Sequence, residues 1–359
     1  MHVGVSRSAI GLRAEMAGLA LDPSFVDPRG WEDQLTRVFG RSWLGTPVLP
    51  FAGPGARPFV LEGLGVPLVE TRDAGGETRV LSNVCTHRAA IVCEKESARL
   101  RCPYHGRQFG LDGRAIKAPG FGPDFPRDED HLPAVPTAWW GPVRFLALRP
   151  RSPFPSEALE PWFRGVPLDG FTSEDPVSYE MPAHWALYCD NFLEGLHIPF
   201  VHPALQASVA SYRVETFAEG SVQIAGARAD EPALTLGEGH PLAGERLAAL
   251  YFWIFPATML NVYPWGISLN VVVPLAPDRT RVIFQSFVRD PSLRETGAGA
   301  GLHQVEMEDE AVVVSQQRGI RSPLYRPGRL APAEAAVAHF HDLLADAIRT
   351  PGDGAIGPS

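Results

Sequence analysis

The chain has 359 residues, of which 45% are hydrophobic and 20% charged, so it can bury a substantial core in about two domains. Its 41 acidic residues outnumber 32 basic ones, and the net charge of −9 argues against nucleic acid as the main partner. The four cysteines are too few for a disulfide-stapled scaffold, which leaves metal or redox chemistry for any that cluster.

Two stretches bear on targeting and membranes. Residues 1–20 lack an apolar core of about 7–15 residues, so we expect no signal peptide. Residues 247–277 carry no charge, but prolines and glycines divide them into pieces of strand length that are rich in aromatic and β-branched side chains. Buried strands explain this stretch better than a membrane span. We therefore expect a soluble, cytoplasmic protein that contacts no membrane.

A helical segment is predicted near the start, over residues 22–43. Asp27 suits the N-cap position and Pro28 the first helical position. Trp31, Leu35 and Val38 then follow at helical spacing. We expect this segment to pack on the second domain.

Residues 44–150 change to a β pattern punctuated by Gly and Pro. The sequence Asp112-Gly113 is a strong hairpin signal between two of the runs. Three prolines within 150–155 predict a domain boundary. The predicted strands include 66–71, 79–83, 108–111 and 143–148.

Two short motifs in this β-rich region each supply one cysteine and one histidine. Cys85 and His87 stand in the first motif, and Cys102 and His105 follow after fourteen intervening residues. Zinc would fit such a Cys₂His₂ set. A Rieske [2Fe–2S] cluster would also fit, with both thiolates on one iron and both imidazoles on the other. In zinc fingers one motif supplies two cysteines and the other supplies two histidines. Here each motif supplies one Cys and one His, which favours the Rieske cluster.

The second half, residues 156–350, begins with a predicted helix over 185–197 and ends with another over 333–348. Turn-sized gaps separate the predicted strands between them, which suggests an antiparallel meander. These strands are 251–255, 259–263, 267–273 and 281–288.

A polar cluster surrounds the first of these helices. Asp190, Glu194 and His197 would form one stripe on a straight helix. Pro199 would end that helix and let the chain bring His202 back towards His197. Two histidines and one carboxylate form the facial triad of non-haem Fe(II) oxygenases, which leaves positions for O₂.

The carboxylate of such a triad must come from elsewhere in the chain. Residues 303–317 look helical and open with four acids, Glu306, Glu308, Asp309 and Glu310. The helix dipole favours acids near a helix N-terminus, which would explain most of them. The pattern alone does not choose which of the four binds a metal.

With both motifs in view, the chain resembles, over nearly its whole length, the catalytic α subunit of Rieske non-haem iron ring-hydroxylating oxygenases. The resemblance implies an α+β fold, with a β-rich Rieske domain at 44–150 and a helix-grip catalytic domain with a long antiparallel sheet at 156–350. It implies that Cys85, His87, Cys102 and His105 hold the [2Fe–2S] cluster, and that His197, His202 and Asp309 hold mononuclear Fe(II).

The resemblance also implies an electron route. Glu194 matches the acid that links the Rieske histidine of a neighbouring subunit to the iron site, and Asp190 and Asn191 join it as candidate catalytic residues. In this family the subunits form a head-to-tail homotrimer, so electrons cross between chains. Arg107 is a departure, because many relatives have Trp after the His-Gly pair.

The chain has neither a plant-type ferredoxin cysteine pattern nor a Gly-rich nucleotide motif. A separate flavin and iron–sulfur reductase, or a ferredoxin, must therefore deliver electrons from NAD(P)H. Residues 253–256 and 261–266 are similar to choline, betaine and carnitine monooxygenases, and their aromatic rings would either cage a trimethylammonium group or simply pack in the core.

We therefore expect O₂-dependent hydroxylation or N-demethylation of a small quaternary ammonium substrate of betaine type. The alternatives are hydroxylation of an aromatic ring, O-demethylation, or a Rieske electron carrier with an inactive second domain.

Overall fold

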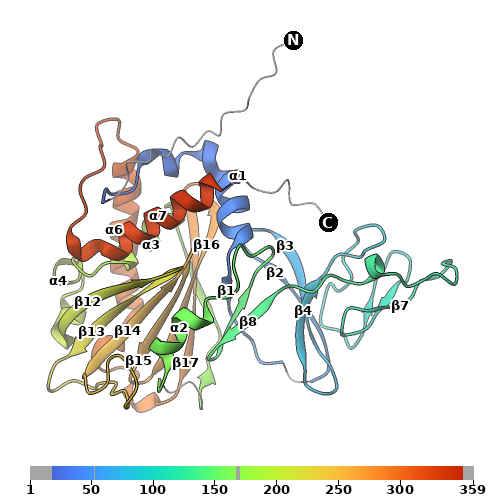
Figure 1. The fold of residues 1–359 in the computed structure, drawn as a ribbon, viewed down its shortest axis with the longest axis horizontal. Coiled ribbons are helices and arrows are strands. Elements are labelled where there is room, and N and C mark those ends of the chain that lie inside the picture. Colours follow the sequence, from blue (N-terminus) through green and yellow to red (C-terminus); the bar gives the residue numbers. More distant parts are fainter. Residues whose placement is uncertain (1–17, 52, 167–169, 351–359) are drawn as a thin grey trace, which may run out of the picture. The chain divides into compact units, whose positions relative to one another are not determined.

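The structure is a computed structural model that describes residues 18–51, 53–166 and 170–350 (Figure 1). The prediction that residues 1–20 contain no signal peptide falls mostly outside the described residues, because residues 1–17 are not among them. The chain divides into two compact units. Unit 1 comprises Met1–Pro47, Trp140–Val143 and Arg149–Ser359, and unit 2 comprises Val48–Trp139 and Arg144–Leu148.

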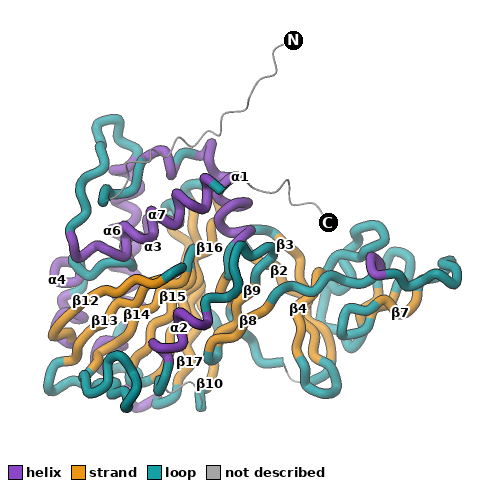
Figure 2. Tube along the Cα trace, viewed as in Figure 1, coloured by secondary structure: helices purple, strands orange, loops and turns teal. Residues whose placement is uncertain are grey.

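Unit 2 consists mainly of strands and long loops, with the short 3₁₀ helix η5 (Asp128–Asp130) among them (Figure 2). One antiparallel sheet contains β2 (Gly55–Leu61), β3 (Val66–Arg72) and β4 (Thr78–Ser82). A smaller one contains β5 (Leu100–Arg101), β6 (Gln108–Phe109) and β7 (Ala115–Lys117). The predicted Asp112-Gly113 turn joins β6 to β7, and Gly113 has a φ of +86°, which favours glycine. The core between these strands contains Cys85, Cys93 and Cys102.

Three short strands lie where the chain passes between the units. They are β1 (Leu44–Thr46), β8 (Thr137–Trp140) and β9 (Val143–Leu146).

Unit 1 begins with the predicted helical segment, which is wound in five short pieces. The Asp27 side chain accepts a hydrogen bond from the Arg29 backbone N–H, so the predicted cap is confirmed. Gln34, fully buried, accepts from the Trp185 indole and donates to the Phe25 carbonyl. The pieces are η1 (Pro23–Val26), η2 (Pro28–Gly30), α1 (Trp31–Asp33), the π-helical η3 (Gln34–Val38) and η4 (Phe39–Arg41).

An eight-stranded antiparallel sheet dominates unit 1 (Figure 1). Strands β12 to β17 pair in chain order, so the predicted meander is confirmed, and β10 and β11 both pair with β17. The uncharged stretch forms buried strands: every residue of β15 is buried. The strands are β10 (Thr172–Ser173), β11 (Val177–Met181), β12 (Val209–Phe217), β13 (Gly220–Ala227), β14 (Leu247–Ile254), β15 (Thr258–Tyr263), β16 (Gly266–Ala276) and β17 (Arg279–Val288).

Helices α3 (Trp185–Phe192), α6 (Leu302–Ile320) and α7 (Ala335–Arg349) of unit 1 lie towards the upper end of this sheet in Figure 1, and α4 (Ile198–Val201) lies at the left beside β12. The predicted apolar stripe of the last helix is confirmed, since Val337, Phe340 and Leu344 are buried. The remaining helices are α2 (Ser156–Phe163), α5 (Pro203–Ser208) and the 3₁₀ turns η6 (Pro291–Leu293), η7 (Gly297–Gly299) and η8 (Pro332–Glu334).

The prediction of one helix over 185–197 is wrong. Helix α3 ends at Phe192, and Leu193 has left the helical conformation, with φ −81° and ψ 5°. Pro199 does not break a helix, because it lies in the first turn of α4, where a missing N–H costs nothing. Asp190, Glu194 and His197 therefore do not share one helical stripe.

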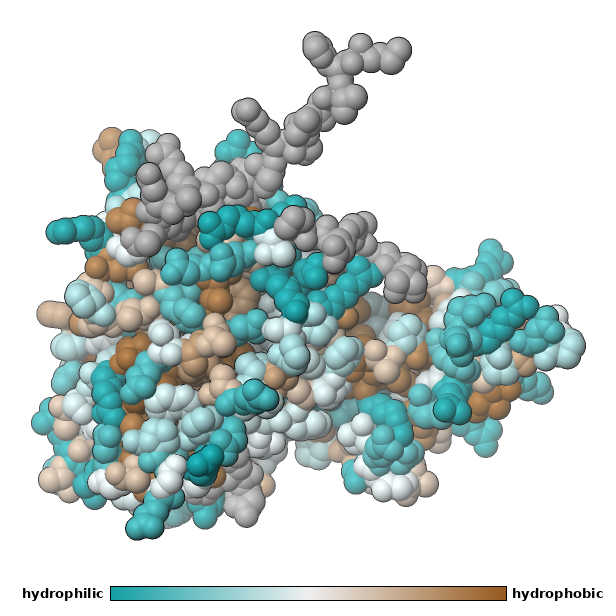
Figure 3. All heavy atoms as spheres, in the orientation of Figure 1, coloured by the Kyte–Doolittle hydropathy of each residue, from teal (hydrophilic) through white to brown (hydrophobic). Residues whose placement is uncertain are grey.

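None of the helices in the described part of the chain is long and apolar enough to cross a membrane. On the face drawn in Figure 3, hydrophilic residues are interspersed with hydrophobic ones.

Candidate metal centres and active site

The two Cys-and-His motifs form neighbouring loops in unit 2. In each loop the backbone turns back on itself: the Ala89 N–H donates to the Cys85 carbonyl at 3.0 Å, and the Gly106 N–H donates to the Cys102 carbonyl at 3.1 Å. The second turn requires a φ of +73° at Gly106, which glycine adopts without strain.

These loops place two sulfur atoms inside and two imidazoles outside. Cys85 and Cys102 are buried and form no disulfide, whereas His87 and His105 are exposed, with ring centroids 4.8 Å apart. Burial raises the pKa of the Cys85 thiol, so a bound metal is needed to stabilise its thiolate. Desolvation and the neighbouring His105 lower the pKa of His87, which favours the neutral, metal-binding form. The donor set fits a Rieske cluster, with one iron on each side.

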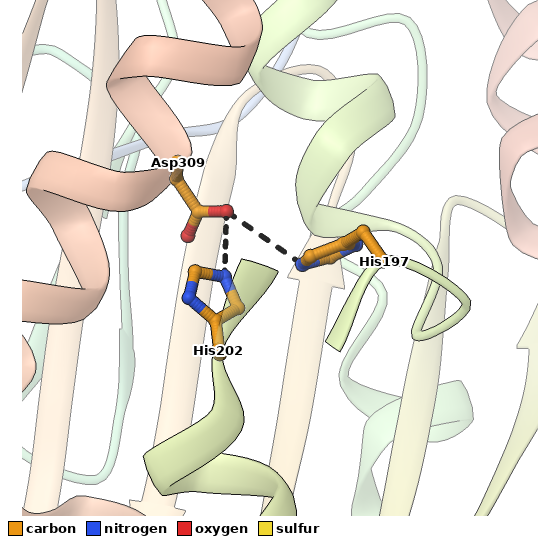
Figure 4. Close-up of side chains that lie close together, drawn as sticks. All are labelled: His197, His202 and Asp309. Atoms are coloured by element: carbon orange, nitrogen blue, oxygen red, sulfur yellow. Dashed lines mark hydrogen bonds and ion pairs between the residues drawn. The ribbon is translucent and has the colours of Figure 1, made fainter. Parts of the chain in front are cut away.

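A second group of potential ligands lies in unit 1, where Asp309 of α6 points towards His197 and His202 (Figure 4). Asp309 Oδ1 is 2.9 Å from His202 Nε2 and 3.6 Å from His197 Nε2. One ligand atom from each residue lies within 4.8 Å of the other two. Two imidazole nitrogens and one carboxylate on one side of a metal are the donor set of non-haem Fe(II) oxygenases, so this group is consistent with mononuclear iron.

The far nitrogen of each imidazole is held by a second carboxylate. His197 Nδ1 lies 2.6 Å from Glu194 Oε1, and His202 Nδ1 lies 2.7 Å from Glu308 Oε2. These contacts fix both rings with Nε2 facing Asp309, the arrangement in which a metal-ligating histidine is oriented by an outer carboxylate. Burial acts to lower the pKa of His202, but hydrogen bonds to Asp309 and Glu308 raise it overall.

The other residues predicted in this region divide between the site and its surroundings. Asn191 Nδ2 donates to Asp309 Oδ1 at 2.6 Å, which positions the carboxylate. Asp190 instead lies 2.9 Å from His341 Nε2 of α7, because consecutive residues of α3 point to different faces of the helix. The position of Glu308 behind His202 had no signal in the sequence, where it was only one acid among four.

A pocket with about 760 Å³ of free space, part of it open to solvent, adjoins His197, His202 and Asp309. Its described lining contains three carboxyl groups, those of Glu194, Glu306 and Asp309, and no lysine or arginine. The aromatic side chains in the lining are Tyr188, Phe192, Tyr212, Tyr251, Tyr263 and Phe284.

Glu306 is the unexpected member of this lining. It is 6% exposed, and desolvation is the largest cause that raises its pKa to about 8. The Tyr188 hydroxyl donates to Glu306 Oε2 at 2.8 Å, whereas the buried Oε1 has no hydrogen-bond partner. Glu306 therefore belongs to the pocket lining and has one buried carboxyl oxygen whose hydrogen-bonding capacity is unused.

The aromatic segments named for their resemblance to quaternary ammonium oxygenases contribute less than expected. Tyr263 and Asn261 line the pocket. Trp253 and Trp265 are fully buried in the core, where their indole N–H groups donate to the carbonyls of Pro256 and Gly299. Core packing is thus the correct reading for these two tryptophans.

Comparison with known proteins covers both units. Residues 52–136 match the model of the Rieske [2Fe-2S] domain, and residues 168–350 match that of the ring hydroxylating alpha subunit (catalytic domain). The chain is 30% identical to the chloroplastic choline monooxygenase of Arabidopsis thaliana over 349 residues, covering 89% of this chain and 80% of that one. It is 25% identical to the carnitine monooxygenase oxygenase subunit of Escherichia coli K12, covering 90% and 92%.

The fold is shared with a solved quaternary ammonium Rieske monooxygenase, whose structure was described in terms of carnitine oxidation and inter-subunit electron transfer. The two chains superpose with a TM-score of 0.72 at 20% identity, covering 92% of this chain and 96% of that one.

His202→Ala should remove one metal and spare the other. We expect purified wild-type protein to hold about three iron atoms per chain, two in the cluster and one at the mononuclear site. The variant should hold about two, with an unchanged cluster absorption spectrum. His303→Ala, which changes an exposed histidine of α6, is the control and should retain about three. Three iron atoms in His202→Ala would contradict the assignment.

Proposed function

Because the chain belongs to the family of Rieske ring-hydroxylating oxygenase alpha subunits, we propose that it hydroxylates or N-demethylates a small quaternary ammonium substrate. One atom of O₂ enters the substrate and the other leaves as water, while NAD(P)H is oxidised by a separate reductase. A hydroxylated N-methyl group would then leave as formaldehyde.

The proposed cluster ligands are Cys85, His87, Cys102 and His105. Their burial pattern supports this, since the thiols lie within the core of unit 2 and the imidazoles reach solvent. An electron donor can therefore approach the histidine side without unfolding the loops. A relative is described as the oxygenase subunit of a carnitine monooxygenase, and we assign the supply of electrons to a separate reductase that acts as a partner of this chain.

His197, His202 and Asp309 are the proposed ligands of Fe(II), which would supply O₂ activation at its open positions. Glu194 and Glu308 hold the two rings, and Asn191 holds the carboxylate, so the donor atoms are oriented before metal binds. An intact donor set of this kind argues against an electron carrier with an inactive second domain.

Glu194 is the proposed electron bridge from the Rieske histidine of a neighbouring subunit. Its side chain is only 14% exposed, lines the pocket and contacts His197 directly. This role requires a homotrimer in which the cluster of one chain meets the iron site of the next. The similarity to a structure described in terms of inter-subunit electron transfer supports the same arrangement here.

The substrate class rests on one observation, the composition of the pocket lining. A cation entering the pocket meets aromatic rings and the unpartnered Glu306 oxygen, and both attract positive charge. An anion would meet three carboxyl groups and no basic side chain. A neutral aromatic substrate, the alternative, would leave the buried Glu306 oxygen without a partner, which costs free energy.

The direct test supplies the protein with a reductase and compares choline, glycine betaine and L-carnitine with benzoate and vanillate. We expect one of the three quaternary ammonium compounds to stimulate oxygen uptake in proportion to NADH loss, with formaldehyde release if the product is demethylated. Coupled turnover of only benzoate or vanillate would favour the aromatic alternative and contradict the proposal.

Glu306→Gln tests the charge recognition. Losing a charge-assisted contact, worth about 1.5–3 kcal/mol, should weaken binding of the cationic substrate by about tenfold or more. The neutral carbon isostere of choline, 3,3-dimethyl-1-butanol, should bind the variant and the wild type equally. Equal weakening for both ligands would point to a general loss of pocket shape instead.

A pH effect follows from the same residue. In the empty pocket the pKa of Glu306 is about 8, so the carboxyl is mostly protonated at neutral pH. A bound cation favours the ionised form and lowers that pKa, so binding near pH 7 should release close to one proton. Calorimetry in two buffers of different ionisation enthalpy measures this release, which should disappear in Glu306→Gln.

Glu194→Gln should stop electron delivery without removing metal. The amide keeps the size of the side chain, but we expect turnover with reductase to fall by more than about 100-fold, beyond the 10–100-fold typical of losing an outer carboxylate. Glu308→Gln is the matched control, because Glu308 holds His202 as Glu194 holds His197. Similar losses in both variants, or normal turnover in Glu194→Gln, would contradict the electron route.

A further inference from the structure

A buried arginine lies beside the two loops proposed to hold the cluster. Arg107 is 2% exposed, although it stands directly after the His105-Gly106 pair at the surface. Its backbone carbonyl accepts a hydrogen bond from the Cys102 N–H at 2.8 Å, which ties it to the second loop. Burying a charged group costs free energy unless the group is paired, so the contacts of Arg107 show how its charge is accommodated.

The guanidinium contacts the first loop. Arg107 Nη1 donates to Thr86 Oγ1 at 3.0 Å, and Thr86 stands between Cys85 and His87. The same nitrogen is 2.9 Å from Asp130 Oδ1, and the Thr86 hydroxyl donates to the Asp130 carbonyl at 2.8 Å. Arg107 therefore joins both loops, through its backbone to one and its side chain to the other.

The surroundings keep this positive charge dry. The guanidinium carbon lies 4.7 Å from the ring centre of Phe121 and 5.2 Å from that of Phe125. Phe121 in turn lies 5.5 Å from the His87 ring. Arg107 Nε is buried without a hydrogen-bond partner. Water therefore screens the charge weakly, and its field extends to the loops.

The ion pair with Asp130 does not cancel this field. The Arg107 side chain is 3% exposed and the Asp130 side chain 15%, so water screens the carboxylate more than the guanidinium. Asp130 also turns its second oxygen to the Arg127 N–H, 2.9 Å away. The guanidinium, in contrast, contacts Thr86 within the ligand loop itself. The guanidinium charge is therefore less screened and lies closer to the ligand loop than the carboxylate charge that opposes it.

We propose that Arg107 tunes the [2Fe–2S] cluster held by these loops, raising its reduction potential through a buried positive charge that Asp130 partly offsets. Reduction adds one electron, delivered by the reductase, and a nearby positive charge stabilises the form that carries it. The proposal rests on the cluster ligands proposed above and is independent of the substrate. Arg107 is a positioning and tuning residue, since it touches none of the reacting atoms.

A purely structural role of the Arg107–Asp130 pair and an electrostatic role predict different effects of substitution on the reduction potential. Removing either partner of a clamp would disturb the loops in the same sense. Removing either charge of a field-setting pair shifts the potential in opposite senses. Arg107→Gln should lower the potential, Asp130→Asn should raise it, and Arg107→Lys, which retains the charge, should stay close to wild type.

The experiment is a redox titration of the full-length protein with both metal centres loaded, followed by electron paramagnetic resonance of the reduced cluster. We expect each neutral variant to change the reduction equilibrium by about tenfold, which is about 59 mV for one electron. Arg114→Gln, an exposed arginine whose side chain is 80% accessible, is the control and should leave the potential unchanged.

Shifts of the same sign in Arg107→Gln and Asp130→Asn, or no shift in either, would overturn the proposal. Iron and sulfide content, together with circular dichroism, report whether each variant keeps its cluster and fold. If Arg107→Gln alone loses the cluster, the sign of the shift in Asp130→Asn decides. Loss of the cluster from both variants in a folded protein would assign the pair a structural role only and would also overturn the proposal. Because potential is measured without substrate, these outcomes are separate from failure of the proposed reaction.

Discussion

The proposed iron site depends on one repeated interaction, the hydrogen bond between an imidazole Nδ1 and a carboxylate. Glu194 and Glu308 each hold one histidine in this way, and both rings then present Nε2 to Asp309. Without these outer contacts the rings could rotate, and three donor atoms would not converge. Since Glu308 and Asp309 are neighbours on α6, a shift of that helix would move a ligand and a ring support together.

The sheet explains why the pocket has its charge pattern. Its uncharged central strand β15 is buried at every position and supplies Asn261 and Tyr263 to the pocket. Carboxyl groups enter only from the helical side, through α6 and the segment around Glu194. A pocket built in this way contains negative charge near the proposed metal and aromatic surface further along the sheet. This polarity suits the quaternary ammonium substrate that we propose, and Glu306 would then be a recognition group although it lies outside the triad.

Short-range patterns in the sequence predicted more of the structure than long-range ones could. The spacing of Cys85, His87, Cys102 and His105 is local, and so is the alternation of strands and turns, so both were readable from the chain. The end of the helix predicted over 185–197 could not be read from the chain, because the conformation of Leu193 decides where α3 ends. Choosing Asp309 among four acids by residue pattern alone was also out of reach. That choice depends on which face of α6 meets His202, over 100 residues away.

Family resemblance supplied roles for Asp309 and Glu194, but it supplied no role for Arg107 or Glu306. Arg107 departs from the pattern of relatives, and only its burial against Phe121, Phe125 and Asp130 gives the departure a meaning. Glu306 looked like a solvated residue of a helix N-terminus until the structure buried it against Tyr188. Both are buried ionisable groups, and their roles depend on surrounding residues that are distant in the sequence.

The central claim is that His197, His202 and Asp309 hold an iron with open positions facing a cation-binding pocket. Electron paramagnetic resonance of the ferrous protein treated with nitric oxide tests it most directly, because the high-spin iron–nitrosyl signal arises only where mononuclear iron has a free position. We predict one high-spin iron–nitrosyl centre per chain, whose spectrum changes when the quaternary ammonium substrate is added and which is absent in Asp309→Ala. A signal that persists in Asp309→Ala, or that no quaternary ammonium compound perturbs, would contradict the account.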